Sequence, residues 1–267
     1  MRIIEPHIHM FSRTTDDYFM MAAAGIECVV EPAFWLGSDR TSVSSCTDYF
    51  EHLISVESAR SNKYGIEYFN CIGHNPKEAN NLSLAHEVVD VIEEKFLQRD
   101  GVVAVGEIGF DLITDAEEEI FRRQLKLAGK YNMPALVHTP HQNKRVGVEK
   151  IINIIREESA DVSKTLVDHN TEETIAMTLD SGVWAGLTVY PITKLSSERA
   201  VQIIRKYGTD RIILSSSADW GYSDPLLVPK TVTNMRLAGF SKEEIEKVVF
   251  QNPYNFYKQS PKFTFEA

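Results

Sequence analysis

The chain has 267 residues, of which 43% are hydrophobic and 25% charged, and its formal net charge is -10 at pH 7. This composition is typical of a globular protein and excludes disordered, collagen-like and disulfide-stapled chains. The acidic balance disfavours tight electrostatic binding of nucleic acid, although a local basic groove or a metal-bridged phosphate contact stays open.

Cysteine usage and hydropathy indicate the compartment. The odd number of cysteines and the lack of a CxxC pair predict free buried thiols in a reducing environment: Cys28, Cys46 and Cys71. The N-terminus has no apolar core of signal-peptide length, and the apolar stretch 18–37 is interrupted by Glu27, Glu31 and Pro32. We therefore expect a soluble cytoplasmic protein without a membrane segment.

Eight short runs rich in apolar and β-branched residues alternate with longer amphipathic segments. The runs are expected to be strands and lie at 2–6, 27–32, 67–72, 102–108, 135–138, 165–168, 182–189 and 211–214. The amphipathic segments are expected to be helices and lie at 48–61, 82–97, 116–131, 146–158, 172–179, 197–207, 225–237 and 241–249.

Strands that alternate with helices predict βαβ units and a parallel sheet. Eight such repeats within 267 residues favour a closed (β/α)8 TIM barrel, with residues 1–267 forming a single domain. An open doubly wound α/β fold is the alternative. It needs a glycine-rich turn after the first strand, and the segment 6–10 (Pro-His-Ile-His-Met) contains no glycine.

Histidines gather where the predicted strands end. Active groups of a (β/α)8 barrel lie at the carboxyl ends of its strands. Six of the eight histidines fall at these ends, namely His7, His9, His74, His138, His141 and His169. Only His52 and His86 fall in helical segments, so the distribution favours one shared site.

The motif His7-Ile8-His9 places two imidazoles on the same face of a strand, about 6.6 Å apart at the backbone. Two imidazoles at that separation can converge on one cation. The alternative is a pair of polar residues on a wet face. A buried barrel strand favours ligation, because an unpaired buried imidazole is costly.

Further carboxylates and histidines continue this pattern on other strands. Glu107 lies in an apolar run and needs either a metal or a salt bridge, while Gly106 and Gly109 suit a close backbone approach. His138, His169 and Asp219 also follow strands; singly, each has a structural explanation, such as helix capping for Asp219. Together, four histidines and two carboxylates on five strands predict a two-metal centre.

The ordered series resembles the TatD-like branch of the metal-dependent amidohydrolases. Its elements are His7-x-His9, Gly106-Glu107-Ile108-Gly109, His138, His169 and Asp219. The segments 121–138 and 252–257 are also similar to that family, so the resemblance spans essentially the whole chain.

The resemblance implies a binuclear centre in which Glu107 bridges two divalent ions. His7, His9 and Asp219 would hold one ion, and His138 with His169 the other. Such donors suit zinc best, with manganese, iron, nickel or magnesium as alternatives. The ions would activate a bridging water. Asp219 would accept its proton and return it to the leaving group, so Asp219 and Glu107 are the expected catalytic residues.

Two neighbours of the expected ligands depart from the family pattern. Glu5 stands where the family has aspartate, and Ser217-Ala218-Asp219-Trp220 replaces the usual Glu-Thr-Asp motif. We therefore expect hydrolysis of an ester, amide or phosphoester bond in a small molecule. A TatD-type deoxyribonuclease or phosphodiesterase is the alternative, and a non-catalytic metal- or metabolite-binding barrel is a third possibility. Expected substrate contacts are His74, His141 and Trp220.

Covalent catalysis is disfavoured by the same sequence. The serine run 215–217 lacks the Gly-x-Ser-x-Gly elbow of serine hydrolases. A Schiff-base enzyme needs a lysine inside the barrel, and Lys164 instead opens its strand. Nothing in the sequence indicates an oligomeric state.

Overall fold

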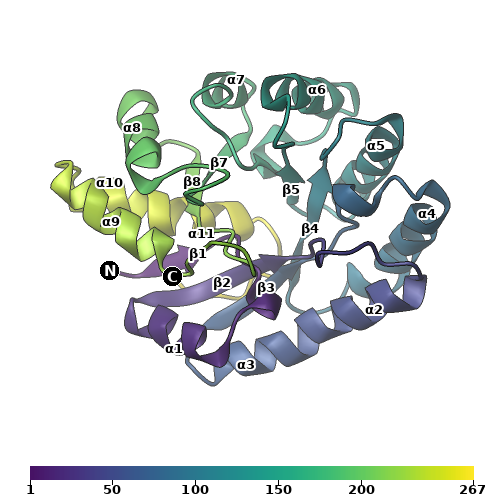
Figure 1. Ribbon diagram of the computed structural model, residues 1–267, viewed down its shortest axis with the longest axis horizontal. Helices are drawn as coiled ribbons and strands as arrows, with labels where there is room; N and C mark the ends of the chain where they lie inside the picture. The colour runs from purple at the N-terminus through teal and green to yellow at the C-terminus, as the bar shows by residue number, and fades with distance from the viewer.

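A computed structural model describes all 267 residues and contains one sheet of eight parallel strands in chain order (Figure 1). The strands are β1 (Ile3–Glu5), β2 (Ile26–Pro32), β3 (Glu67–Cys71), β4 (Val102–Gly109), β5 (Ala135–His138), β6 (Thr165–Val167), β7 (Trp184–Thr188) and β8 (Ile212–Ser215). Each predicted run overlaps one observed strand. The expected TIM barrel is confirmed.

Helices surround the strands on the outside (Figure 1). They are α1 (Thr15–Ala23), α2 (Val43–Glu51), α3 (Ser58–Asn62), α4 (Leu82–Val91), α5 (Asp115–Lys130), α6 (Lys144–Glu157), α7 (Ile175–Asp180), α8 (Ser197–Tyr207), α9 (Leu227–Leu237), α10 (Lys242–Glu246) and α11 (Asn252–Tyr257). Residues 52–57 join α2 to α3 as helix, and 247–251 join α10 to α11.

Helix α1, which was not predicted from the sequence, begins at a capping box. The Asp17 side chain accepts a hydrogen bond from the Thr14 backbone N–H at 2.9 Å, which fixes the first turn. Tyr18 and Met21 are fully buried. Helix α1 thus packs on the outside of the first two strands through only a narrow apolar stripe. The hydrophobic periodicity of its sequence is weak for this reason.

The ends of β8 and β1 meet through the segments that follow them. The Ser217 N–H donates to the His7 carbonyl at 2.8 Å, and the His9 N–H donates to the Ala218 carbonyl at 2.9 Å. The buried Glu5 carboxylate also accepts the Ser216 N–H at 3.1 Å. These bonds hold the first two histidines against the chain that leads to Asp219.

The barrel interior and the C-terminal segment share one apolar cluster. It includes interior residues such as Val30 and Leu136 together with Phe256, Tyr257 and Phe263. The Tyr257 hydroxyl donates to the Pro6 carbonyl at 2.7 Å. The segment 252–257 therefore braces the end of β1 from within the core.

All three cysteines are buried and free, as expected. No helix has the length and hydropathy needed to cross a bilayer.

A buried carboxylate on β2 holds the turn that follows the two N-terminal histidines. Glu31 accepts the Phe11 N–H at 2.9 Å and the Tyr68 hydroxyl at 2.7 Å. Burial raises the pKa of Glu31 to about 8. The folded protein therefore keeps a proton on Glu31 that the unfolded chain releases above its ordinary pKa.

This raised pKa makes stability depend on pH. The contribution of Glu31 is fully present below the unfolded pKa and is lost as pH rises through about 8. Relative to wild type, Glu31→Gln should gain at least about 1 kcal/mol of unfolding free energy between pH 5 and pH 8. Denaturant titrations at both pH values measure this difference. The exposed Glu87→Gln should show none, and a flat difference for Glu31→Gln would contradict the expectation.

Candidate metal centre

A pocket of about 140 Å³ lies at the carboxyl ends of the strands. Five of the six expected ligands line it, namely His9, Glu107, His138, His169 and Asp219. His7, with 1% of its surface exposed, lies beneath them. The barrel thus brings the expected groups from β1, β4, β5, β6 and β8 to one mouth.

Glu107 lies at the centre of the imidazole cluster. Its Oε1 atom is 3.2 Å from His7 Nε2, 3.3 Å from His138 Nδ1 and 3.4 Å from His169 Nε2. Its Oε2 atom accepts a hydrogen bond from Asn75 Nδ2 at 3.1 Å. One carboxylate oxygen therefore lies within 3.2–3.4 Å of nitrogens from both histidine pairs, and Asn75 holds the other oxygen.

The imidazoles face one another through ring nitrogens. His7 Nε2 and His9 Nε2 are 3.2 Å apart, and His169 Nε2 and His138 Nδ1 are 3.1 Å apart. With Glu107, each pair forms a group whose donor atoms lie within 4.8 Å of one another. Close nitrogens of this kind are typical of lone pairs that converge on a cation.

The ionisation of the cluster also fits a metal. Burial lowers the pKa of His9 and of His169, which keeps both rings neutral and their lone pairs available. Burial opposes ionisation of Glu107, but His7 and His138 hold its pKa well below the usual range. His9 Nδ1 and His138 Nε2 are buried without a hydrogen-bond partner. Burial opposes the charged form of His7, but Glu107 and Asp168 raise its pKa to about 9, so His7 must lose a proton when it binds a metal. Neutral His9 and His169, the ionised Glu107 and the unpartnered nitrogens are donors that suit a divalent ion.

Asp168 orients the cluster from below. Its Oδ2 atom accepts a hydrogen bond from His7 Nδ1 at 2.5 Å, which turns His7 Nε2 toward Glu107. Its Oδ1 atom accepts the Thr188 hydroxyl at 3.1 Å, and the Thr188 oxygen accepts from His169 Nδ1 at 2.7 Å. Burial opposes ionisation of Asp168, yet His169 and His7 hold its pKa well below the usual range.

Glycines make room for these close approaches. A Cβ atom on Gly106 would lie 2.7 Å from the Leu136 Cβ, and one on Gly109, where φ is +124°, would lie 2.3 Å from the His138 carbonyl. The expected close backbone approach at both positions is confirmed. A Cβ on Gly186 would lie 2.1 Å from Asp168 Oδ1, so the buried carboxylate depends on this glycine as well.

Asp219 lies at the rim of the pocket and outside both histidine groups. Its Oδ1 atom accepts the Tyr190 hydroxyl at 2.9 Å and the Gly221 N–H at 2.7 Å. Arg13 donates to its backbone carbonyl at 2.9 Å. The metal-ligand role expected for Asp219 stays a prediction.

The three expected substrate contacts lie in different places. His141 and Trp220 line the pocket. His74 does not, because its backbone pairs with Gln124 of α5 at 2.7 and 3.0 Å, and the next residue, Asn75, reaches the pocket instead. Residue type alone could not show which of two neighbours in a turn faces the site.

Two further polar residues of the site were not assigned a role from sequence. Asp168 directly precedes His169, and an acidic residue beside an expected ligand was the available signal. Lys194 lines the pocket from a loop whose composition is ordinary, so no sequence signal marked it.

Comparisons with known proteins agree with this geometry. The family model for TatD-related DNases matches residues 6–258. An uncharacterised metal-dependent hydrolase of Methanocaldococcus jannaschii is 33% identical over 259 residues, which are 96% of this chain and 100% of that protein. The crystal structure of a TatD-like protein from Archaeoglobus fulgidus has a TM-score of 0.79 and 26% identity, covering 96% of this chain and 99% of that chain. The phosphotriesterase homology protein of Escherichia coli shares the fold, with a TM-score of 0.69, 17% identity and coverage of 96% and 98%.

The barrel, its cluster of imidazole and carboxylate donors, and these relatives together define a metal-dependent hydrolase. The chain belongs to the family of TatD-related DNases, whose model covers nearly its whole length. The resemblance inferred from the sequence and the expected hydrolase class are both confirmed.

The contact between Asp168 and His7 predicts an effect on metal affinity. Asp168→Asn keeps the shape of the side chain but removes the charge that fixes the His7 tautomer. We expect metal affinity to fall about 10- to 100-fold, as is typical when the partner of a ligating histidine is lost. Competition with a chromophoric chelator measures it. Asp161→Asn, at the end of the barrel where the chain enters β6, should retain wild-type affinity, and equal affinities in both variants would contradict the role of Asp168.

The space under Asp168 predicts a second effect. Gly186→Ala should displace the Asp168 carboxylate, weaken metal binding and lower the unfolding free energy by about 1–3 kcal/mol, because the added Cβ has no room. Gly129→Ala in α5, where a Cβ meets nothing within 4 Å, should instead be neutral or stabilising. Thermal unfolding and metal titration test the pair. Unchanged metal affinity in Gly186→Ala would show that the carboxylate tolerates displacement.

Proposed function

We propose that the pocket holds two divalent cations and that Glu107 bridges them. His7 with His9 and His138 with His169 would each supply the imidazole donors of one ion. The observation that carries this proposal is the Glu107 Oε1 atom, which lies 3.2–3.4 Å from nitrogens of both histidine pairs. Imidazole with carboxylate favours zinc, and manganese, iron, nickel and magnesium are the alternatives.

When bound, such ions polarise the scissile bond and lower the pKa of a water molecule that attacks it. The protein supplies orientation and proton transfer. Tyr190 and Gly221 hold Asp219 Oδ1, which leaves Oδ2 without a hydrogen bond from the chain. Asp219 Oδ2 would accept a proton from the attacking water and return it to the leaving group.

We infer that the substrate is a small molecule with an ester, amide or phosphoester bond. The pocket of about 140 Å³ suits a compact group, and the net charge of -10 disfavours a long polyanion. A deoxyribonuclease activity is the second candidate, favoured by the family to which the chain belongs. The three free buried thiols support a cytoplasmic location for this reaction.

Metal content tests the centre directly. Elemental analysis of purified protein should give two ions per chain, and an anomalous-scattering map should place them on both sides of Glu107. His138→Ala should reduce the content to about one ion or less, because it removes one donor of a two-histidine group. His86→Ala, on the surface of α4, should keep two ions. Fewer than one ion per chain in the wild-type protein would refute the proposal.

Turnover tests the reaction class. The metal-loaded protein should hydrolyse at least one member of a panel of lactones, amides, p-nitrophenyl phosphodiesters and single-stranded DNA, and a chelator should abolish the activity. Asp219→Asn should lower kcat about 10²- to 10⁴-fold, as loss of a general base does. Degradation of DNA from its 3′ end would favour the nuclease. An activity that Asp219→Asn leaves intact would contradict the proton-transfer role and favour a non-catalytic barrel.

A further inference from the structure

Two lysines lie near the imidazole cluster, one after β5 and one after β7. Lys144 is the first residue of α6, after β5, and Lys194 lies between β7 and α8. Because β6 lies between β5 and β7 in the sheet, the two loops flank the end of β6, where Asp168 and His169 lie. Lys194 lines the pocket, and Lys144 lies beside it, bound to Thr139, the residue that follows His138.

Neither ammonium group has a carboxylate partner. Lys194 Nζ donates to the Ser217 hydroxyl at 3.1 Å, and Lys144 Nζ donates to the Thr139 hydroxyl at 2.8 Å. A third lysine at the same mouth, Lys77, instead forms an ion pair with Asp111 at 2.7 Å. The two lysines thus form no ion pair within the chain, and each ammonium group has only a neutral hydroxyl as its hydrogen-bond partner.

Burial disfavours the charged form of both lysines. Burial and the charge of Lys194 lower the pKa of Lys144 to about 8, and burial lowers that of Lys194. The charges of Glu107, Asp168 and Asp219 favour the ammonium form of Lys194, but none of these carboxylates forms an ion pair with it. An anion that accepts hydrogen bonds from both ammonium groups would offset the desolvation.

The site of such an anion would lie next to the reacting bond. Ser217 Oγ, which accepts from Lys194, is 3.5 Å from His7 Nε2. The aromatic rings of the pocket come from two loops: Phe34 and Trp35 follow β2, and Trp220 follows β8, the strand next to β7. Their centroids are close, at 5.1 Å between Phe34 and Trp220 and 6.0 Å between Trp35 and Trp220.

We propose that Lys194 and Lys144 bind an oxyanion of the substrate, a carboxylate or a phosphate, that is separate from the bond being hydrolysed. The substrate would be a small anionic ester or amide whose flat or apolar part packs on Trp35 and Trp220. The placement beside a hydrolysed bond rests on the proposed function. The binding of the anion rests on the contacts of the two lysines.

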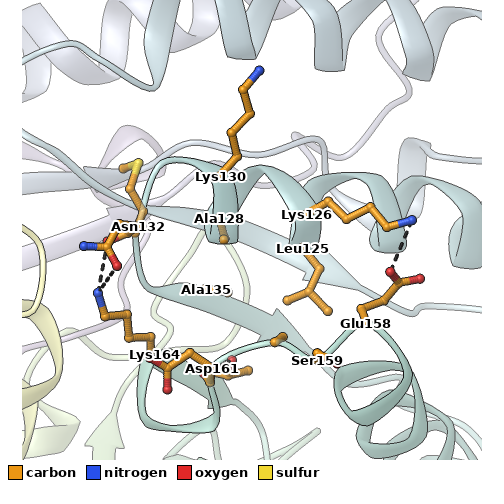
Figure 2. Close-up of a pocket in the computed structure, with 14 residues that line it drawn as sticks. Leu125, Lys126, Ala128, Lys130, Asn132, Ala135, Glu158, Ser159, Asp161 and Lys164 are labelled. Atoms are coloured by element: carbon orange, nitrogen blue, oxygen red, sulfur yellow. Dashed lines mark hydrogen bonds and ion pairs between the residues drawn. The ribbon is translucent and has the colours of Figure 1, made fainter.

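A second group of lysines in the molecule shows the contrast. The pocket in Figure 2 lies where the chain enters β5 and β6, at the opposite end of the barrel. There Lys126 pairs with Glu158 at 3.2 Å, and Lys164 donates to both the side-chain and main-chain oxygens of Asn132. Lys164, like Lys194, has no carboxylate partner but lies away from the imidazole cluster, so it serves as a control for the loss of a lysine charge outside the site.

Calorimetric titration of the zinc-loaded protein tests the subsite with three probes: benzoate, phenyl phosphate and the neutral benzamide. We expect one or both anions to bind and Lys194→Met to weaken that binding about tenfold or more, as loss of a charge-assisted hydrogen bond does. Lys144→Met should weaken it severalfold. Lys194→Arg should retain most of the affinity, and Lys164→Met should match wild type. Comparison of benzoate with phenyl phosphate shows which oxyanion is preferred.

Two results would overturn the subsite: anion affinities unchanged in Lys194→Met and Lys144→Met, or equal losses for benzamide, which has no charge to lose. Zinc content and hydrolysis of neutral p-nitrophenyl acetate, measured on the same samples, report separately on the proposed function. Lysine-dependent anion binding without hydrolysis would leave the subsite standing and refute the hydrolytic role. Hydrolysis together with anion binding that does not depend on the lysines would support the hydrolytic role and refute the subsite.

Discussion

The hydrogen bond between Asp168 and His7 Nδ1 fixes the geometry on which the centre depends. When His7 loses its second proton to bind a metal, the ionised acceptor keeps the remaining N–H at Nδ1 and leaves the Nε2 lone pair for the ion. Thr188 extends the same control to His169, because its hydroxyl can donate to Asp168 while its oxygen accepts from His169 Nδ1. One buried carboxylate thereby sets the orientation of two histidines, one from each histidine pair that contacts Glu107.

The barrel supplies the second constraint, which is that carboxyl ends of parallel strands meet at one face. His138 ends β5 and Glu107 lies in β4, so hydrogen bonding between these strands alone brings them together. The glycines on either side of Glu107 let β4 approach its neighbours closely. Packing in the sheet, more than any local motif, therefore explains how residues distant in the chain form one cluster.

The difference between strand packing and loop conformation explains what could be predicted from the sequence. Strand runs and strand-end residues follow from local hydropathy, so the barrel and the convergence of His7, His9, Glu107, His138 and His169 were within reach. Side-chain positions that depend on the conformation of a loop could not be predicted from the sequence. Asp219 lies four residues beyond β8, and the turn that binds its Oδ1 to Tyr190 cannot be inferred from strand periodicity. Lys194 reaches the pocket through the same kind of irregular loop.

The overall charge of the chain and the lysines near the pocket act over different distances. The net charge of -10 repels a long polyanion at a distance, where all charges of the chain act together. Lys194 in the pocket and Lys144 beside it form no ion pair and act over a few ångströms, where screening is weak. In the proposed subsite, long-range repulsion and short-range attraction would together favour a ligand with one or two negative charges over a polymer.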